Sequence, residues 1–151
     1  RNGDGLDARL NKRSGRWGMT GFGDLREVHR LVAEGNEDAK LALDVYVHRI
    51  VGYIGNYTAQ MGGVDVITFT AGVGENDDVV RKMVCDKLAP FGVKLDEEKN
   101  ATRSKEPRII STPDSKITIC VIPTNEELAI ARKSAAIAEA GEDTYGNVFS
   151  K

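Results

Sequence analysis

The most constraining feature of this sequence is a pair of short apolar runs, each followed at once by a turn and then by helical periodicity. Residues 64–70 form the first run and residues 117–122 the second. Both are rich in Val, Ile and Thr, a composition typical of buried strands when it is bounded by turn residues. Two successive strand–turn–helix units predict an α/β fold in which helices pack on a sheet. Ligands bind beyond the carboxyl ends of the strands in such sheets, so both turns are candidate sites.

Residues 38–61 carry the strongest helical pattern in the chain, because apolar side chains recur along them at helical spacing. The apolar stripe consists of Leu43, Val47, Ile50, Val51, Ile54, Tyr57 and Met61, and it is widened by Leu41 and Val45. So broad an apolar surface needs covering on most of its sides. We therefore expect this helix in the core or at a subunit interface.

Shorter elements complete the predicted order along the chain. We expect helices over residues 24–33, 77–88 and 125–140, a helical turn within 93–106 and a short strand over 108–111. Asp24 is a candidate cap for the first of these helices, and Gly35 is a candidate for its end. Residues 141–151 have little to bury, so we expect a loose tail there.

Composition excludes several classes of function. The net charge of −2 leaves no basic field that would attract nucleic acid or an anionic membrane. The apolar stretches are too short to span a bilayer, and residues 1–13 lack the apolar core of a signal peptide. Cys85 and Cys120 have no metal-ligand spacing and are interpreted as buried free thiols of a cytoplasmic protein.

The first turn contains the candidate ligand-binding residues Gly72, Val73, Gly74, Glu75 and Asn76. Glycine lets the backbone come into contact with a ligand because no Cβ intervenes. Asp77 and Asp78 follow at the start of the next helix, where their carboxylates would repel a polyphosphate. We therefore expect the turn to hold the adenine or ribose of a nucleotide. The alternative is an ordinary glycine turn that leads into a capped helix.

The second turn, residues 123–127, offers a carboxylate for a metal ion. Thr124 and Glu127 have the spacing of a capping box, which gives Glu127 a structural role. Glu126 has no such role and could ligate Mg²⁺ directly or through water, with nucleotide phosphates completing the coordination. The alternative is a solvated glutamate that stabilises the first turn of the helix.

A third candidate group is Asp24, Leu25 and Arg26. An aspartate can accept hydrogen bonds from ribose hydroxyls, and an arginine can stack on a base. The alternative is a helix cap beside an exposed arginine. His29 is expected at the surface and His48 partly buried, and neither has a nucleophile at the spacing of a catalytic triad.

These turns occur within longer stretches that resemble the acetate kinase family. The similarity runs in order from about residue 10 to residue 140, and its motifs are highly specific when taken together. The matching stretches are residues 10–15, 24–26, 62–76, 92–100, 110–116 and 121–127.

The resemblance implies a ribonuclease-H-like α/β half of the actin-like or sugar-kinase-like ATPase fold. Residues 1–151 would be the C-terminal nucleotide-binding domain of a two-domain kinase. That kinase would convert ATP and acetate to ADP and acetyl phosphate, reversibly. Residues 72–76 would line the adenosine pocket, and Asp24, Leu25 and Arg26 would contribute to the same site. Glu126 would serve Mg²⁺, with Mn²⁺ as a possible substitute.

The family's residues that clasp acetate and transfer the phosphoryl group belong to its N-terminal half, so we assign no catalytic residue to this chain. The loop between Gly21 and Asp24 is also shorter than is usual in the family. A propionate or butyrate kinase is an alternative, because the acyl pocket lies elsewhere. A non-catalytic dimerisation module built on residues 38–61 is another, and the resemblance itself implies a homodimer.

Overall fold

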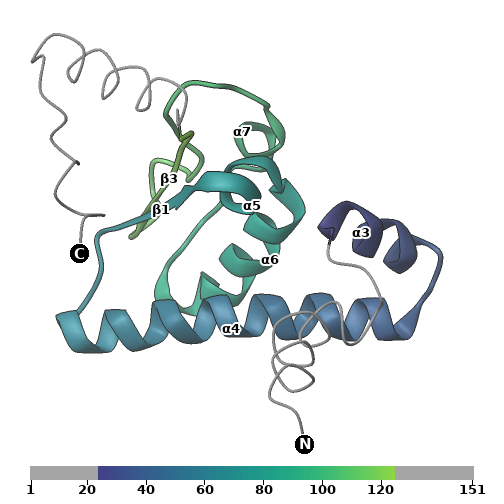
Figure 1. The fold of residues 1–151 in the computed structure, drawn as a ribbon. Coiled ribbons are helices and arrows are strands. Elements are labelled where there is room, and N and C mark those ends of the chain that lie inside the picture. The colour runs from purple at the N-terminus through teal and green to yellow at the C-terminus, as the bar shows by residue number, and fades with distance from the viewer. Residues whose placement is uncertain (1–23, 125–151) are drawn as a thin grey trace, which may run out of the picture.

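A computed structural model describes residues 24–124 of the chain, and Figure 1 shows its helices and strands. The predicted helix 125–140 and the predicted tail 141–151 lie outside the described residues. The elements are α3 (Leu25–Ala33), α4 (Glu37–Met61), β1 (Val66–Thr70), α5 (Ala71–Asn76), α6 (Asp78–Leu88), the 3-10 helix η1 (Ala89–Phe91), α7 (Glu97–Ala101), β2 (Arg108–Ile109) and β3 (Thr118–Ile122).

The sheet has the strand order β1-β3-β2. Strand β1 pairs with β3 in parallel, from Val66 opposite Thr118 to Thr70 opposite Ile122. Strand β2 runs antiparallel to β3. The sheet with its packed helices confirms the predicted α/β fold, and the parallel pairing puts the carboxyl ends of β1 and β3 at the same edge, which brings the two candidate turns together.

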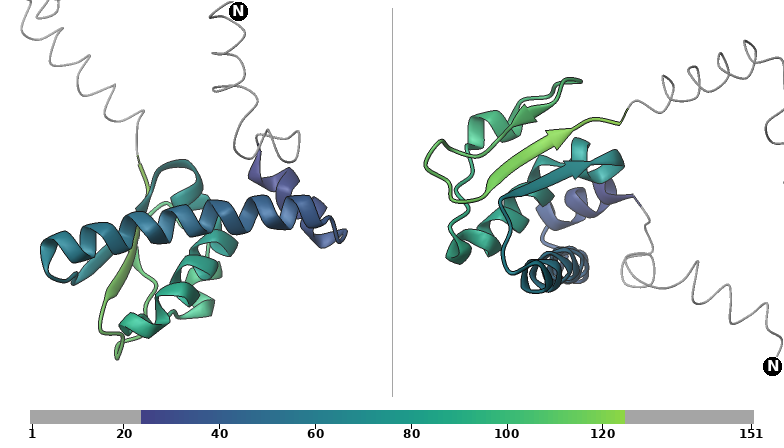
Figure 2. Two further views of the ribbon diagram at one scale, coloured as in Figure 1. Left: turned by 90° about the horizontal axis from the view of Figure 1, so that it is seen from below. Right: turned by 90° about the vertical axis from the view of Figure 1, so that its left-hand side faces the viewer.

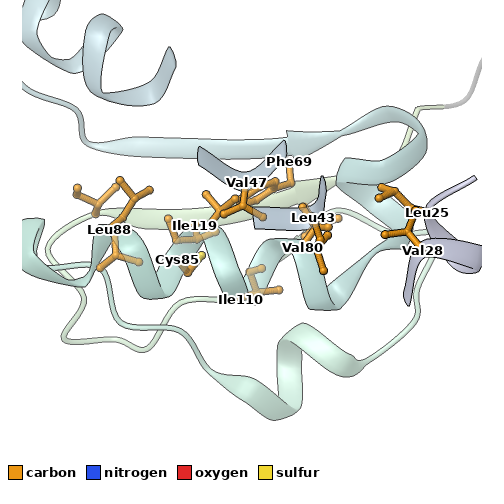
Figure 3. Packing of buried hydrophobic residues seen from close by; sticks show 14 of the residues in the cluster. Leu25, Val28, Leu43, Val47, Phe69, Val80, Cys85, Leu88, Ile110 and Ile119 are labelled. Atoms are coloured by element: carbon orange, nitrogen blue, oxygen red, sulfur yellow. The ribbon is translucent and has the colours of Figure 1, made fainter. Parts of the chain in front are cut away.

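Helices cover one face of this sheet. The right-hand view of Figure 2 shows α4 end-on, with α6 beside it and the strands above both helices. The buried strand residues Phe69, Ile119 and Val121 share the core with Val47 of α4 and Val84 of α6. In Figure 3 the core side chains form one continuous layer that extends from Leu88 to Leu25.

The prediction that residues 64–70 form a buried strand is wrong in part. Strand β1 exists, but only Phe69 is buried along it, and Val66 is exposed. The described sheet places β1 at an edge, and the described helices cover a single face. Strand β3, which lies between its neighbours, matches the prediction better because Ile119 and Val121 are fully buried.

Helix α4 begins one residue earlier than predicted, because the Asn36 side chain accepts a hydrogen bond from the Ala39 amide at 2.9 Å. It ends at Gly62, which adopts the left-handed conformation with φ 73° that glycine tolerates. Its N-terminal half packs against α3 and α6, and Leu43 and Val47 are buried there.

The predicted covering of α4 is not found among residues 24–124. Tyr57 and Met61 are 58% and 64% exposed, and Leu41 and Val45 are also exposed. At 1.5 Å per residue, α4 is about 38 Å long and α6 only about 17 Å, so α6 cannot cover it end to end. Ile50, Val51 and Ile54 lie between these extremes, partly buried against the core.

Three smaller predictions can also be compared with the structure. His48 is exposed rather than partly buried. Cys85 and Cys120 are free thiols as predicted, although only Cys85 is buried. Within residues 24–124, no helix combines the length and apolar character needed to cross a membrane.

Candidate functional site

A cavity of about 540 Å³ lies where two of the predicted ligand-binding segments meet. Its volume is within the range of small-molecule sites in proteins. One wall comes from the start of α3 and another from α5, so segments far apart in sequence share one cavity. The lining residues are Asp24, Leu25, Arg26, Gly72, Val73, Asn76, Asp77 and Arg103.

The segment after β1 is a short helix, α5, rather than the turn that the sequence predicts. Its backbone is kinked at Gly72, where φ is 38° and ψ is −107°, outside the helical region. Asn76 donates a side-chain hydrogen bond to the Gly72 carbonyl at 2.8 Å, and the Asp77 amide donates to the Val73 carbonyl at 2.9 Å. These bonds wind the segment into a helical turn that ends at Asp77.

Gly72 is suited to a ligand-binding wall for two reasons. Its positive φ is a conformation that residues with a side chain rarely adopt. A Cβ placed there would meet no protein atom within 4 Å, although Gly72 lines the cavity. Added bulk at this position would therefore extend into open space next to the candidate site. Gly74 differs, because a Cβ there would contact the Phe69 backbone at 3.5 Å.

A buried arginine fixes the C-terminal end of α5. Arg81 of α6 is only 2% exposed and donates to the carbonyl oxygens of Gly74 at 3.1 Å and Glu75 at 2.9 Å. It also donates to the Asn100 side-chain oxygen at 2.8 Å and the Asn100 carbonyl at 2.7 Å. Burial lowers the pKa of Arg81, and the nearby charge of Arg108 adds to this. An arginine remains protonated at neutral pH despite such a shift.

Asn100 extends this network to the start of α6, since its side chain donates to the Asp78 carbonyl at 2.9 Å. Arg81 is not among the site residues predicted from the sequence, and Val79, near the start of the same helix, is 45% exposed. A signal for Arg81 was present, because it precedes Val84, Cys85 and Leu88 at helical spacing on the buried stripe.

At the α3 wall, the structure confirms the capping alternative for Asp24. Its side chain accepts from the Arg26 amide at 2.9 Å. Arg26 folds back onto the same carboxylate, with Nη2 to Oδ2 at 2.6 Å, while its side chain remains 92% exposed. This contact raises the pKa of Arg26. Leu25 lines the cavity but is only 5% exposed and belongs to the core.

The carboxylates predicted at the start of α6 are in place. Asp77 caps the helix by accepting from the Val80 amide at 2.9 Å. Its second oxygen lies 2.8 Å from His29 Nε2, so His29 joins α3 to α6 and is partly buried rather than a plain surface residue. Asp77 also lines the cavity, which puts negative charge beside the Gly72 wall.

The two turns at the carboxyl ends of β1 and β3 are in direct contact. The Glu75 carboxylate accepts from the Thr124 amide at 2.7 Å. Glu126 and Glu127 lie outside the described residues, so the metal-ligand and capping-box predictions for them stay predictions. Within residues 24–124, no group of three or more His, Cys, Asp and Glu side chains is arranged to hold a metal ion.

Comparisons with known proteins agree with the resemblance seen in the motifs. The family model of the acetokinase family matches residues 2–132. An acetate kinase from Desulfotalea psychrophila is 54% identical over 135 residues, which cover 89% of this chain and 33% of that protein. The chain spans about a third of the length of the curated relatives it matches.

Solved structures give the same result for the fold. The crystal structure of Porphyromonas gingivalis acetate kinase matches with a TM-score of 0.80 and 41% identity, covering 91% of this chain and 35% of that one. A propionate kinase from Francisella tularensis subsp. tularensis SCHU S4 matches with a TM-score of 0.77 and 38% identity, covering 88% and 34%. These matches confirm the predicted half of the actin-like ATPase fold, and the chain belongs to the acetokinase family.

Proposed function

We propose that this chain supplies the adenosine and magnesium site of an acetate kinase, which converts ATP and acetate reversibly to ADP and acetyl phosphate. The observation that carries the proposal is a single cavity lined both by Asp24–Arg26 and by residues of the α5 segment, namely Gly72, Val73, Asn76 and Asp77. The resemblance to the acetate kinase family implied one nucleotide site for both segments, which lie far apart along the chain. The whole enzyme is proposed to act in the cytoplasm as a homodimer.

The cavity favours the nucleoside end of ATP over its phosphates. Asp24 and Asp77 put carboxylates on the lining, and these repel phosphate groups. Gly72 and Val73 instead offer backbone and a small apolar side chain. We propose that the adenosine lies here and that the phosphates extend out of the cavity, toward Glu126.

Magnesium is proposed to bind through Glu126 together with the phosphates. Mg²⁺ commonly uses one or two carboxylates and keeps several waters, so a single glutamate beside a triphosphate is a suitable donor set. Glu75 supports this arrangement, because its hydrogen bond to the Thr124 amide ties the adenosine wall to the segment that leads to Glu126.

Calorimetric titration with Mg-ATP tests the proposal, comparing the unmodified chain with Gly72→Val and Glu126→Ala. Gly72→Val should abolish or strongly weaken binding by filling the cavity. Glu126→Ala should weaken only the part of the affinity that depends on magnesium. Equal affinity in all three proteins would refute both site assignments. Adenosine without metal serves as the control ligand, since Glu126→Ala should leave its binding unchanged.

The acyl and phosphoryl-transfer residues are proposed to lie in the two-thirds of the relatives' length that this chain does not span. Phosphoryl transfer depends on positioning and charge neutralisation from both sides of the phosphate. We therefore expect the purified chain to give no acetyl phosphate in a hydroxamate assay. Robust turnover by a preparation free of other acetate kinases would contradict the proposal that the transfer residues lie outside this chain.

A propionate kinase is a second candidate, because one of the matching solved structures is a propionate kinase at 38% identity. Acetate kinases match this chain at up to 56% identity, so acetate is the favoured acid. A panel of acetate, propionate and butyrate with the full-length enzyme separates them through kcat/KM.

A dimerisation role is the third candidate, and the exposed apolar residues of α4 favour it. Tyr53, Tyr57 and Met61 are all more than half exposed along the C-terminal half of this helix. Sedimentation of the chain at tens of micromolar tests pairing, and a monomer at that concentration would argue against it.

A further inference from the structure

Arg103 supplies a wall of the cavity that neither sequence motif provides. It follows α7, whose cap at its C-terminal end is Thr102. Asn100, near the end of α7, is buried and is held by Arg81 and by the Asp78 carbonyl. The backbone that leads to Arg103 is therefore anchored to the start of α6, close to the other cavity walls.

The charges around the cavity leave Arg103 available for a ligand. Asp24 accepts from Arg26, and Asp77 pairs with His29. The Arg103 guanidinium has no hydrogen bond or ion pair with any residue between 24 and 124, and its side chain is exposed. The positive charge of Arg103 on the cavity lining is thus not paired with any carboxylate in the described part of the protein.

The remaining lining indicates which part of a nucleotide this charge would meet. Asp24 and Asp77 make the cavity unfavourable for phosphates. Gly72 presents bare backbone, and Leu25 and Val73 are apolar, which suits a flat aromatic ring. A guanidinium is itself planar, and it stacks on aromatic rings through cation–π attraction.

We propose that Arg103 is a nucleotide-binding residue whose guanidinium stacks on the adenine base. This inference rests on the proposed function, since it requires a nucleotide in the cavity. It adds a contact from the α7 loop to the two motifs, so the base is held by three separate parts of the chain. The contact is to the base and not to the phosphates.

Calorimetric titrations of Arg103→Ala with adenosine, ADP and Mg-ATP test the inference. Stacking predicts that all three ligands bind more weakly by the same factor, roughly threefold to thirtyfold for a cation–π contact. Lys105→Ala is the matched control, because Lys105 is an exposed cation nearby that does not line the cavity. It should leave all three affinities unchanged, and circular dichroism should show that both variants are folded.

Each other outcome overturns a specific statement. Weaker binding of ADP and Mg-ATP with unchanged adenosine would place Arg103 on the phosphates. Unchanged binding of all three would remove it from the site while leaving the proposed function intact. Full affinity in Arg103→Lys would show that charge alone matters and would refute stacking. If the unmodified chain binds none of the three ligands, the proposed function fails for this chain and the inference fails with it.

Discussion

Arg81→Met removes a side chain that joins α5, α6 and α7 through hydrogen bonds. The substitution keeps a flexible apolar stem of similar length in the core and deletes the guanidinium. Four acceptors lose their donor: the carbonyls of Gly74, Glu75 and Asn100, and the side-chain oxygen of Asn100. The structure allows the cost of this loss to be estimated bond by bond.

The two bonds to Asn100 are buried, whereas those to Gly74 and Glu75 are partly accessible. A hydrogen bond to a charged group contributes about 1.5–3 kcal/mol, so the two buried bonds together contribute about 3–6 kcal/mol. Water can replace the donor at the accessible carbonyls, so we assign them little cost. Removing a buried charge recovers part of its desolvation penalty, which brings the expected net loss to about 2–4 kcal/mol.

Thermal and urea denaturation followed by circular dichroism measure this loss. For a chain of this size, 1 kcal/mol lowers the midpoint by about 2–4 °C, so Arg81→Met should melt about 5–15 °C lower. Lys82→Met is the matched control. Lys82 pairs with Glu97 at 2.8 Å and Asp86 at 3.3 Å on the surface, and such pairs contribute less than about 1 kcal/mol.

Equal stability of Arg81→Met and Lys82→Met would refute the reasoning, because it would show that the buried bonds do not stabilise the fold. A double-mutant cycle with Asn100→Ala sharpens the test. Asn100→Ala removes the side-chain acceptor of one of the two bonds that these residues share, so the two substitutions should be non-additive by about 1 kcal/mol or more. Additive losses would mean that Arg81 does not stabilise the fold through the Asn100 side chain.

Two further predictions concern stability. Burial raises the pKa of the Cys85 thiol from 9.0 to about 11, so the folded state binds that proton more tightly than the unfolded state. The contribution of this thiol to the free energy of unfolding is therefore complete below about pH 9 and is lost as the pH rises toward 11. Cys85→Ala should flatten this part of a pH–stability profile measured by urea denaturation. An unchanged slope would contradict the raised pKa of Cys85. Gly92→Ala should lose about 1 kcal/mol or more, because φ is 93° and a Cβ would lie 2.6 Å from Lys116 Cδ. In a Lys116→Ala background the penalty should shrink but persist, and its complete disappearance would show that the clash alone was responsible.

Local signals explain why the element order could be predicted from the sequence. Asp24 caps α3, and Gly62, following α4, is left-handed, both through interactions within a few residues. The parallel pairing of β1 with β3 was also accessible, because two strand–turn–helix units in succession favour it. The periodicity of α4 identified Leu43 and Val47 correctly as buried residues.

What covers each apolar surface could not be predicted, because it depends on distant parts of the chain. The pattern of α4 is the same near Val47 and near Tyr57, yet only the first is buried among the described residues. The apolar sequence of β1 is typical of a central, buried strand, but β1 lies at the edge of the described sheet. Periodicity reports which side of an element is apolar, while the length and position of its neighbours decide whether that side is covered.

The candidate site shows the same division between local and distant information. Gly72 and Asp77 could be selected from a short motif, because the glycine turn and the helix cap are local features. Arg103 could not, since nothing in residues 101–105 marks it and only the packing of α7 brings it to the cavity. Arg81 is intermediate: its spacing put it on a buried stripe, but its acceptors come from two other helices.

The position of Arg81 couples the stability of the fold to the shape of the site. It holds the Gly74 and Glu75 carbonyls on one side and, through Asn100, the loop that carries Arg103 on the other. Arg81→Met should therefore weaken adenosine binding severalfold even at temperatures where the variant is fully folded, although Arg81 does not line the cavity. Titration at low temperature, with folding confirmed by circular dichroism, measures this effect. Unchanged affinity in a variant that melts earlier would show that the walls keep their shape without Arg81, and the coupling would have to be abandoned.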